Sequence, residues 1–178
     1  MALHVALFLW AAAVSPSQFP QFEAKVKAYT QLVDRLDREM GRVPDRATAE
    51  EVHAHKLALA TAIAAARPGA KQGDVFVPTE AQPLIRQIRE GTAGRDGAAA
   101  RKAIGEDDPK TSKNTPQVAL RPNEPYPDGA PLSTVPPSLL LRLPALPKSV
   151  EFRFVGKALV LRDVRANVIV DYIPNALP

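Results

Sequence analysis

The chain is 178 residues long, which suits one modest domain, and its hydrophobic content of 46% is ordinary for a globular protein. It has no cysteine, which excludes disulfides, a thiol nucleophile, cysteine-ligated metals and a lipid-modified cysteine. The net charge of +4 comes from 23 basic residues scattered among 19 acidic ones, without a basic run interleaved with aromatics, so nucleic acid is not an expected partner.

The N-terminal stretch has the pattern of a secretory signal peptide. Val5 to Val14 form an uninterrupted apolar run, and small residues at Ala11 and Ala13, or at Ser15 and Ser17, provide cleavage positions. The run is shorter than the roughly 20 residues that cross a bilayer, so no stable membrane span is expected after signal removal. We therefore assign residues 1–17 to a signal peptide and expect a periplasmic or secreted protein. The alternative is a buried N-terminal helix of a cytoplasmic protein, because no lysine or arginine precedes the run.

Two helices are predicted next. The first has apolar residues at steps of three and four, and Gly41 and Pro44 end it. The second follows a capping box, Thr48 with Glu51, and ends before Pro68. Because their connection is short, the helices are expected to form an antiparallel hairpin. The narrow apolar seam of the first helix needs a partner helix and is either core or an exposed, coiled-coil-like surface for another protein. The seam residues are Phe22, Val26, Tyr29, Val33, Leu36 and Met40.

Shorter helices and a proline-rich segment follow. One helix is expected to start near Gln82, because Pro83 fits best in a first turn, and another is expected from Ala98 to Ile104. Residues 18–105 are therefore assigned to a helical region. Residues 106–147 contain ten prolines, which exclude helix and central strands, so this segment is expected to run extended over the surface. Four of its leucines are expected to anchor it on the core and cover the sheet: Leu139, Leu140, Leu141 and Leu143.

The C-terminal residues 148–178 predict a small three-stranded antiparallel meander. Alternating apolar residues run from Val150 to Ile173, with turn signals at Gly156 and Asn167. Such a sheet has only marginal stability alone, so other segments must cover its apolar face. Its free edge strand is a second candidate surface for a partner. The expected fold class is α+β: a helical hairpin, short helices, a proline-rich extended segment and this meander.

Few residues are candidates for chemistry. His53 and His55 are two positions apart on a helix, which turns their side chains about 200° apart, so they cannot chelate one metal ion as an i, i+4 pair does. Asp163, Asn167 and Asp171 match no calcium-binding loop and are interpreted as strand-end charges and an Asx turn. No serine–histidine–aspartate arrangement or phosphate-binding loop is evident. We therefore predict no catalytic residue, no cofactor and no metal ligand.

The C-terminal strands resemble those of known exported proteins. Phe152 to Gly156, followed by Leu159 to Asp163 and Val168 to Asp171, is similar to the C-terminal hairpin of the nickel and cobalt regulator RcnB family of small exported bacterial proteins. The upstream half has no histidine-rich tract, so a metal-efflux role is not carried over. The ending Ile173 to Ala176 is similar to that of uncharacterised exported proteins of soil bacteria, which implies an envelope location and no activity.

These observations predict a non-enzymatic exported envelope protein with a binding or structural role and another envelope protein as its partner. The alternative is a small-ligand or metal-responsive periplasmic protein, with His53 and His55 as weak ligands. A surface apolar groove would favour the binding or structural role. A carboxylate cluster around His53 would favour the metal-responsive role. A deep cleft with a buried, paired carboxylate would favour an enzyme. The sequence does not indicate the oligomeric state.

Overall fold

The computed structural model describes residues 17–178 except 42, 45, 107 and 109–117, so the apolar run expected to be a signal lies outside the described residues. The described residues form helices and one antiparallel sheet, which confirms the α+β class. Among the helices within these ranges, none has both the length and the apolarity that a bilayer crossing requires. The elements are α1 (Pro20–Met40), α2 (Ala49–Ala66), α3 (Pro78–Gly91), α4 (Asp96–Glu106), α5 (Pro137–Leu140), β1 (Val150–Val155), β2 (Ala158–Asp163) and β3 (Val168–Ile173).

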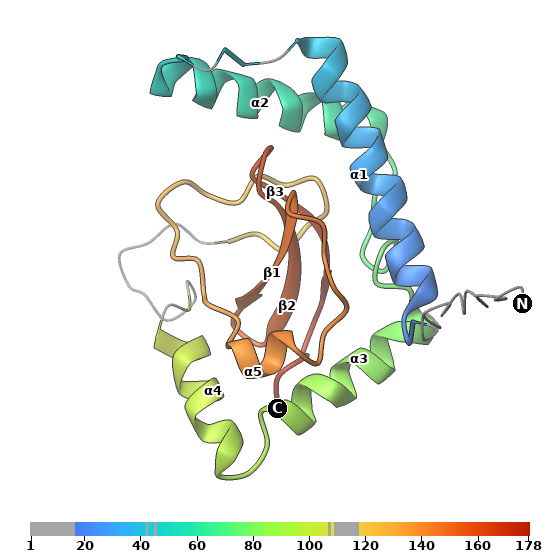
Figure 1. Ribbon diagram of the computed structural model, residues 1–178, viewed down its shortest axis with the longest axis vertical. Coiled ribbons are helices and arrows are strands. Elements are labelled where there is room, and N and C mark those ends of the chain that lie inside the picture. The colour runs from blue at the N-terminus through green and yellow to red at the C-terminus, as the bar shows by residue number, and fades with distance from the viewer. Residues whose placement is uncertain (1–16, 42, 45, 107, 109–117) are drawn as a thin grey trace, which may run out of the picture.

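The three strands form the predicted meander, paired in the order β1-β2-β3 (Figure 1). Phe152 of β1 lies opposite Leu161 of β2, and β2 pairs with β3 across a bulge between Leu161 and Arg162. Each turn contains a residue in the left-handed region, Gly156 at φ 58° and Asn167 at φ 56°, and glycine and asparagine enter this region most easily. The turn signals of the sequence therefore mark the observed turns.

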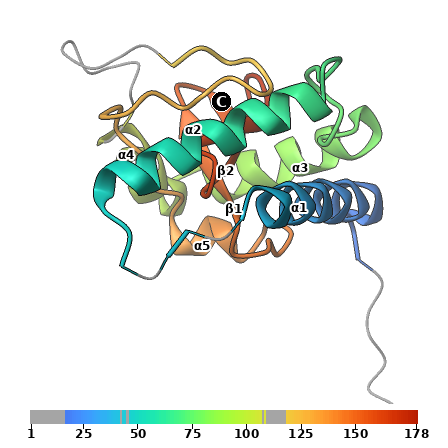
Figure 2. The same cartoon turned by 90° about the horizontal axis from the view of Figure 1, so that it is seen from above.

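The helices surround the sheet and cover its apolar face. Figure 1 shows α1 beside the sheet, α2 beyond one end of the strands, and α3, α4 and α5 near their other end. In the view from above in Figure 2, α2 passes over the end of the sheet. At the centre of this core, the Phe22 ring stacks on Phe76 at 5.1 Å and on Phe152 at 6.0 Å between centroids. The α1 seam therefore packs on the sheet and on the loop that contains Phe76 as well as against its expected partner helix α2.

The first turn of α1 is capped by another helix. Its N-cap residue Phe19 makes no side-chain hydrogen bond, so the exposed amides of the turn need another acceptor. Glu80 of α3 supplies it, because Gln21 N–H donates to Oε1 at 2.9 Å and Phe22 N–H donates to Oε2 at 2.7 Å. A carboxylate also interacts favourably with the positive end of the helix dipole. This contact fixes the start of α1 against α3.

The hairpin of α1 and α2 is confirmed, and so is the capping box at the start of α2. Glu51 N–H donates to Thr48 Oγ1 at 3.2 Å, and Thr48 N–H donates to Glu51 Oε2 at 2.7 Å. The expected start of α3 near Gln82 is wrong, because the helix begins at Pro78 and contains Pro83. Proline at this position removes one hydrogen bond to the carbonyl of Thr79, which is exposed and open to water.

The proline-rich segment covers the second face of the sheet. Val118 and Tyr126 pack against Val160 and Ile169. Asn123 N–H donates to Ile169 O at 2.8 Å, and Tyr126 N–H donates to the carbonyl of the residue before β3 at 2.7 Å. Residues 123–126 thus pair with the first half of the β3 edge, because the amides between the prolines remain available as donors. The expected free edge is not present along this part of β3.

The leucine-rich end of the proline-rich segment anchors it only in part. Leu139 and Leu143 are buried in the main core, whereas Leu140 and Leu141 are exposed. The prediction that all four leucines cover the sheet is therefore wrong for two of them. The expectation of no helix in this segment is also wrong, because Pro137–Leu140 form α5 with a proline in the first turn, where proline is tolerated. A four-residue helix presents only one face to the core, so its other side chains must face outward.

Candidate functional site

Most of the predicted partner surface lies in the core. Phe22, Val26, Tyr29 and Val33 are at most 4% exposed and belong to the cluster that joins the helices to the sheet. Leu36 is partly buried beside this cluster, and Met40, at the end of α1, is 36% exposed. Within the seam, only its C-terminal end is therefore accessible to a partner.

An apolar groove lies at this accessible end, between the last turns of α1 and the first half of α2. It has a volume of about 360 Å³, its walls are formed by Val43, Val52 and Leu59, and we call it the hairpin groove. Val52 is 38% exposed. Apolar side chains that remain open to water in a concave site are a common mark of an interaction surface. The groove can take apolar groups of a partner or ligand.

Charged side chains form the floor of the hairpin groove. His55 Nε2 lies 2.7 Å from Asp37 Oδ1 and links α2 to α1. Arg165, from the turn between β2 and β3, donates through Nη1 to Asp34 Oδ1 at 2.7 Å and lies 3.8 Å from Asp37 Oδ2. These contacts link both helices to the turn between β2 and β3. Among the described residues, Lys56 also lines the groove without an ion pair, and Nε and Nη2 of Arg165 are buried without a hydrogen-bond partner.

The two histidines of α2 contact different carboxylates. His53 Nδ1 lies 3.9 Å from Asp128 Oδ2 in the proline-rich segment, whereas His55 contacts Asp37 of α1. Within the described part of the chain, no group of three or more histidine, aspartate or glutamate side chains is arranged to hold a metal ion. The geometry therefore brings no ligand set together around either histidine.

Asp163 closes the turn after β2 and binds α1. Its Oδ1 accepts the amides of Arg165 and Ala166 at 2.8 and 2.9 Å, which is the Asx turn predicted from the sequence. Its Oδ2 accepts the Tyr29 hydroxyl at 3.1 Å. Burial raises the pKa of Tyr29 and the pKa of Asp163, and the amide hydrogen bonds offset part of the rise for the aspartate. Both side chains are enclosed, so we interpret the pair as a structural contact.

Asp171 is a buried carboxylate in β3 that organises the loop before α3. Its Oδ2 accepts the amides of Val75 and Phe76 at 2.8 Å each, and its Oδ1 accepts Gly73 N–H at 3.0 Å. Burial raises the pKa of Asp171, and the amide donors offset part of this rise. The prediction of a strand-end charge is wrong for Asp171, because the residue lies buried inside β3. The available signal was a single acid inside an otherwise apolar strand.

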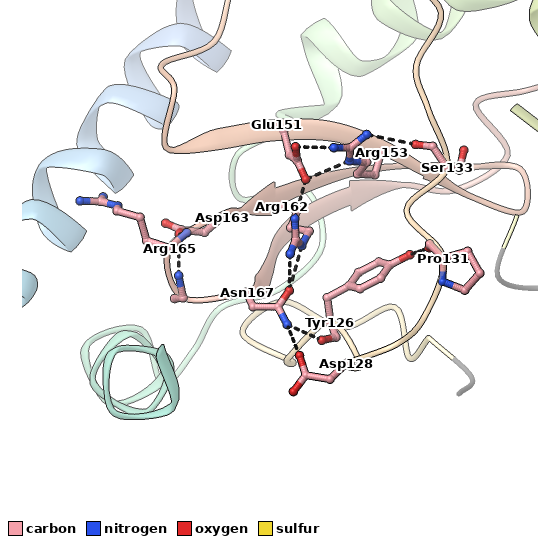
Figure 3. A network of polar contacts seen from close by, with 11 residues as sticks. Tyr126, Asp128, Pro131, Ser133, Glu151, Arg153, Arg162, Asp163, Arg165 and Asn167 are labelled. Atoms are coloured by element: carbon pink, nitrogen blue, oxygen red, sulfur yellow. Dashed lines mark hydrogen bonds and ion pairs between the residues drawn. The ribbon is translucent and has the colours of Figure 1, made fainter. Parts of the chain in front are cut away.

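The second face of the sheet carries a network of polar contacts (Figure 3). Glu151 accepts Arg153 Nη2 and Arg162 Nη1, each at 2.6 Å. Arg162 also donates to Asn167 Oδ1 at 2.6 Å, and its guanidinium lies 5.4 Å from the centre of the Tyr126 ring. Burial alone would raise the pKa of Glu151, but the hydrogen bonds and charges of both arginines outweigh it and lower the pKa below 4.5. The network joins the sheet to its proline-rich cover.

We expect Glu151 to make a contribution to stability that depends on pH. Because its pKa is lower in the folded state, its contribution is present above about pH 4.5 and is lost as pH falls through the folded-state pKa. We expect the stability difference between the wild type and Glu151→Gln to shrink from pH 7 to pH 3, measured by urea unfolding. The raised pKa values of Asp163 and Asp171 make stability change with pH in the opposite direction. This effect is the same in the wild type and the variant, so it cancels in the stability difference. Glu124→Gln, at an exposed position, is the control, and equal profiles for both variants would contradict the prediction.

Comparisons with known proteins leave the hairpin groove as the main guide to function. No protein-family model, no curated protein and no solved structure matches this chain. The buried carboxylates Asp163 and Asp171 serve the fold, and the histidines have separate partners. Of the features described above, the groove combines a hollow with accessible apolar walls.

Proposed function

We propose that this protein is a non-enzymatic exported envelope protein, periplasmic or secreted, that binds another protein through the hairpin groove. The single observation that carries the proposal is the pair of accessible apolar walls, Val43 and Val52, on either side of the groove. A groove between two helices suits the apolar face of a partner helix, which is a recurring mode of recognition. The occupant we expect is an amphipathic helix of another envelope protein.

The export part of the proposal rests on the sequence. The apolar run from Val5 to Val14 has the length of a signal core, and the C-terminal strands are similar to those of small exported proteins. The absence of cysteine is compatible with this location, because the fold then needs no disulfide in an oxidising compartment. A metal-responsive role has no support in the described contacts of His53 and His55. A small ligand would use the same groove, and the binding experiment below distinguishes it from a protein partner.

Export is tested by the intact mass of the protein in each cell fraction of a native-like host. We expect the periplasm or medium to contain a form that lacks about the first 13 to 17 residues. A full-length form confined to the cytoplasm would overturn the export part of the proposal. It would leave the hairpin groove as a binding site for a cytoplasmic partner.

Binding is tested by a photocrosslinking amino acid at position 52, compared with the same group at Thr61 on the opposite face of α2. We expect one discrete adduct from position 52, mapped by mass spectrometry to apolar positions of a partner helix, and none from position 61. Val43→Asp, which charges the opposite wall, should remove the adduct while the circular dichroism spectrum stays unchanged. Equal crosslinking from both positions would contradict the proposal. A small molecule retained by the wild type but lost from Val43→Asp in native mass spectra would favour the small-ligand alternative.

A further inference from the structure

A second hollow lies far from the hairpin groove, where the start of α1 meets the end of α3 and the residues after α5. It has a volume of about 430 Å³, and we call it the basal hollow. Glu23 of α1 and Glu90 of α3 line it, and Leu141 and Arg142 line it after α5. The hollow therefore brings acidic, basic and apolar groups to one place on the surface.

Leu141 projects into solvent beside this hollow. It is 89% exposed, the highest value among the large apolar side chains of the described residues. Its position is fixed, because Leu139 and Leu143 on either side of it are buried in the core. A Cβ atom at Gly91 would lie 3.0 Å from Leu139 Cδ1 and 3.1 Å from Arg142 Cδ, so this part of the chain packs tightly against α3. Leu141 is thus an apolar side chain held outward by a rigid support.

Two opposite charges in the basal hollow have no side-chain partner within the described residues. The guanidinium of Arg142 and the carboxylate of Glu90 line the same hollow, but neither makes a side-chain hydrogen bond or ion pair there, whereas the nearby Glu23 accepts the Ser17 hydroxyl at 2.6 Å. An acidic residue from one helix and a basic residue from the segment after α5 form a surface that is complementary to a rotated copy of itself. A two-fold axis brings residue i of one copy to residue j of the other, and residue j to residue i.

We propose that the basal hollow is the contact surface of a symmetric homodimer. Leu141 of each copy enters the hollow of the other, and Arg142 of each copy pairs with Glu90 of the other. The surface is smaller than the roughly 20–30 residues a side of a standard interface, so the dimer is weak and dissociates on dilution. This surface is separate from the hairpin groove and does not depend on the proposed function.

The test is sedimentation of the purified chain over a range of concentrations, with its N-terminus determined by intact mass because Ser17 borders the hollow. We expect a monomer–dimer equilibrium in the wild type, and a monomer at every concentration for Leu141→Asp. Leu57→Asp, at an exposed position of α2 outside the hollow, should dimerise like the wild type. Circular dichroism spectra should be the same for all three proteins.

A charge exchange identifies the symmetric contact. Arg142→Glu and Glu90→Arg should each weaken the dimer about tenfold, because each replaces two attractive pairs by two repulsive ones. An equimolar mixture of the two variants should restore association, because the heterodimer contains two attractive pairs again. A monomeric wild type, a dimer that survives Leu141→Asp, or a mixture that associates no better than its components would each overturn the proposal.

Discussion

Replacing Asp171 with asparagine is expected to lower the free energy of unfolding by about 2–5 kcal/mol. The two carboxylate oxygens accept three amides of the loop before α3, those of Gly73, Val75 and Phe76. In asparagine, one oxygen becomes an NH₂ group, which donates hydrogen bonds and cannot accept them. The NH₂ group replaces either Oδ1, which accepts the amides of Gly73 and Tyr172, or Oδ2, which accepts those of Val75 and Phe76. Two backbone amides then face another donor, and the penalty is largest where they are buried, because water cannot replace the bond.

Urea unfolding measures this change, and amide hydrogen exchange locates it. Protection should fall at Gly73, Val75 and Phe76 more than in β1, because the loop loses its acceptor directly. Asp128→Asn is the matched control, since this exposed carboxylate accepts only a 3.2 Å contact from Asn167 among the described hydrogen bonds. We expect the control to change stability by less than about 0.5 kcal/mol. Equal effects at the two positions would show that Asp171 does not hold the loop.

Replacing Phe22 with alanine is expected to lower the free energy of unfolding by about 3–5 kcal/mol. The ring is 1% exposed and stacks on both Phe76 and Phe152, so its removal leaves a cavity between α1, the loop before α3 and the sheet. Phe22→Leu retains most of the buried apolar area but loses the ring contacts. It should therefore lower the free energy of unfolding less than the alanine variant does. Denaturant unfolding of the three proteins tests the order.

Met40→Ala is the control on the same helix and the same predicted seam. Met40 is 36% exposed, so the change should alter stability by less than about 0.5 kcal/mol. A similar loss for Met40→Ala and Phe22→Ala would mean that the seam is not divided into a buried part and an accessible end.

The strands and turns could be predicted from the sequence because their signals are local. Alternation from Val150 onward gives the faces of β1 and β2, and Gly156 and Asn167 sit at the two turns because their backbones are left-handed there. The capping box of α2 is also local, with only three positions between Thr48 and Glu51. Each of these signals is complete within a few residues, so no knowledge of the tertiary fold is needed.

The burial of the α1 seam could not be decided from the sequence. An apolar stripe packs equally well on a sheet, on a second helix or on another protein, and the chain contains candidates for the first two. The deciding contacts are Phe22 with Phe152 and Tyr29 with Asp163, which join residues more than 100 positions apart. The hairpin groove had a weak signal in the sequence, because Val52 continues the apolar pattern of α2 beyond the part that the core covers.

Polar residues that stabilise distant segments were also beyond prediction. Glu80 looks like an ordinary first-turn acid of α3, but its carboxylate caps α1 at a distance of 58 positions along the chain. Residues 123–126 were expected to run over the surface, and no local pattern indicates that their amides pair with β3. In each case, the role depends on which other segment is nearby, and this is a property of the assembled chain.

The attachment of α1 to the meander has a consequence for the order of folding. During synthesis α1 emerges early, but Asp163, which accepts the Tyr29 hydroxyl, follows 134 positions later. The apolar face of α1 therefore has no sheet to pack against until translation of the strands is nearly complete. Contacts of such long sequence separation slow folding. A nascent chain of this protein thus stays without its final core through most of its elongation, and a truncation before β1 would leave every helix without the sheet it covers.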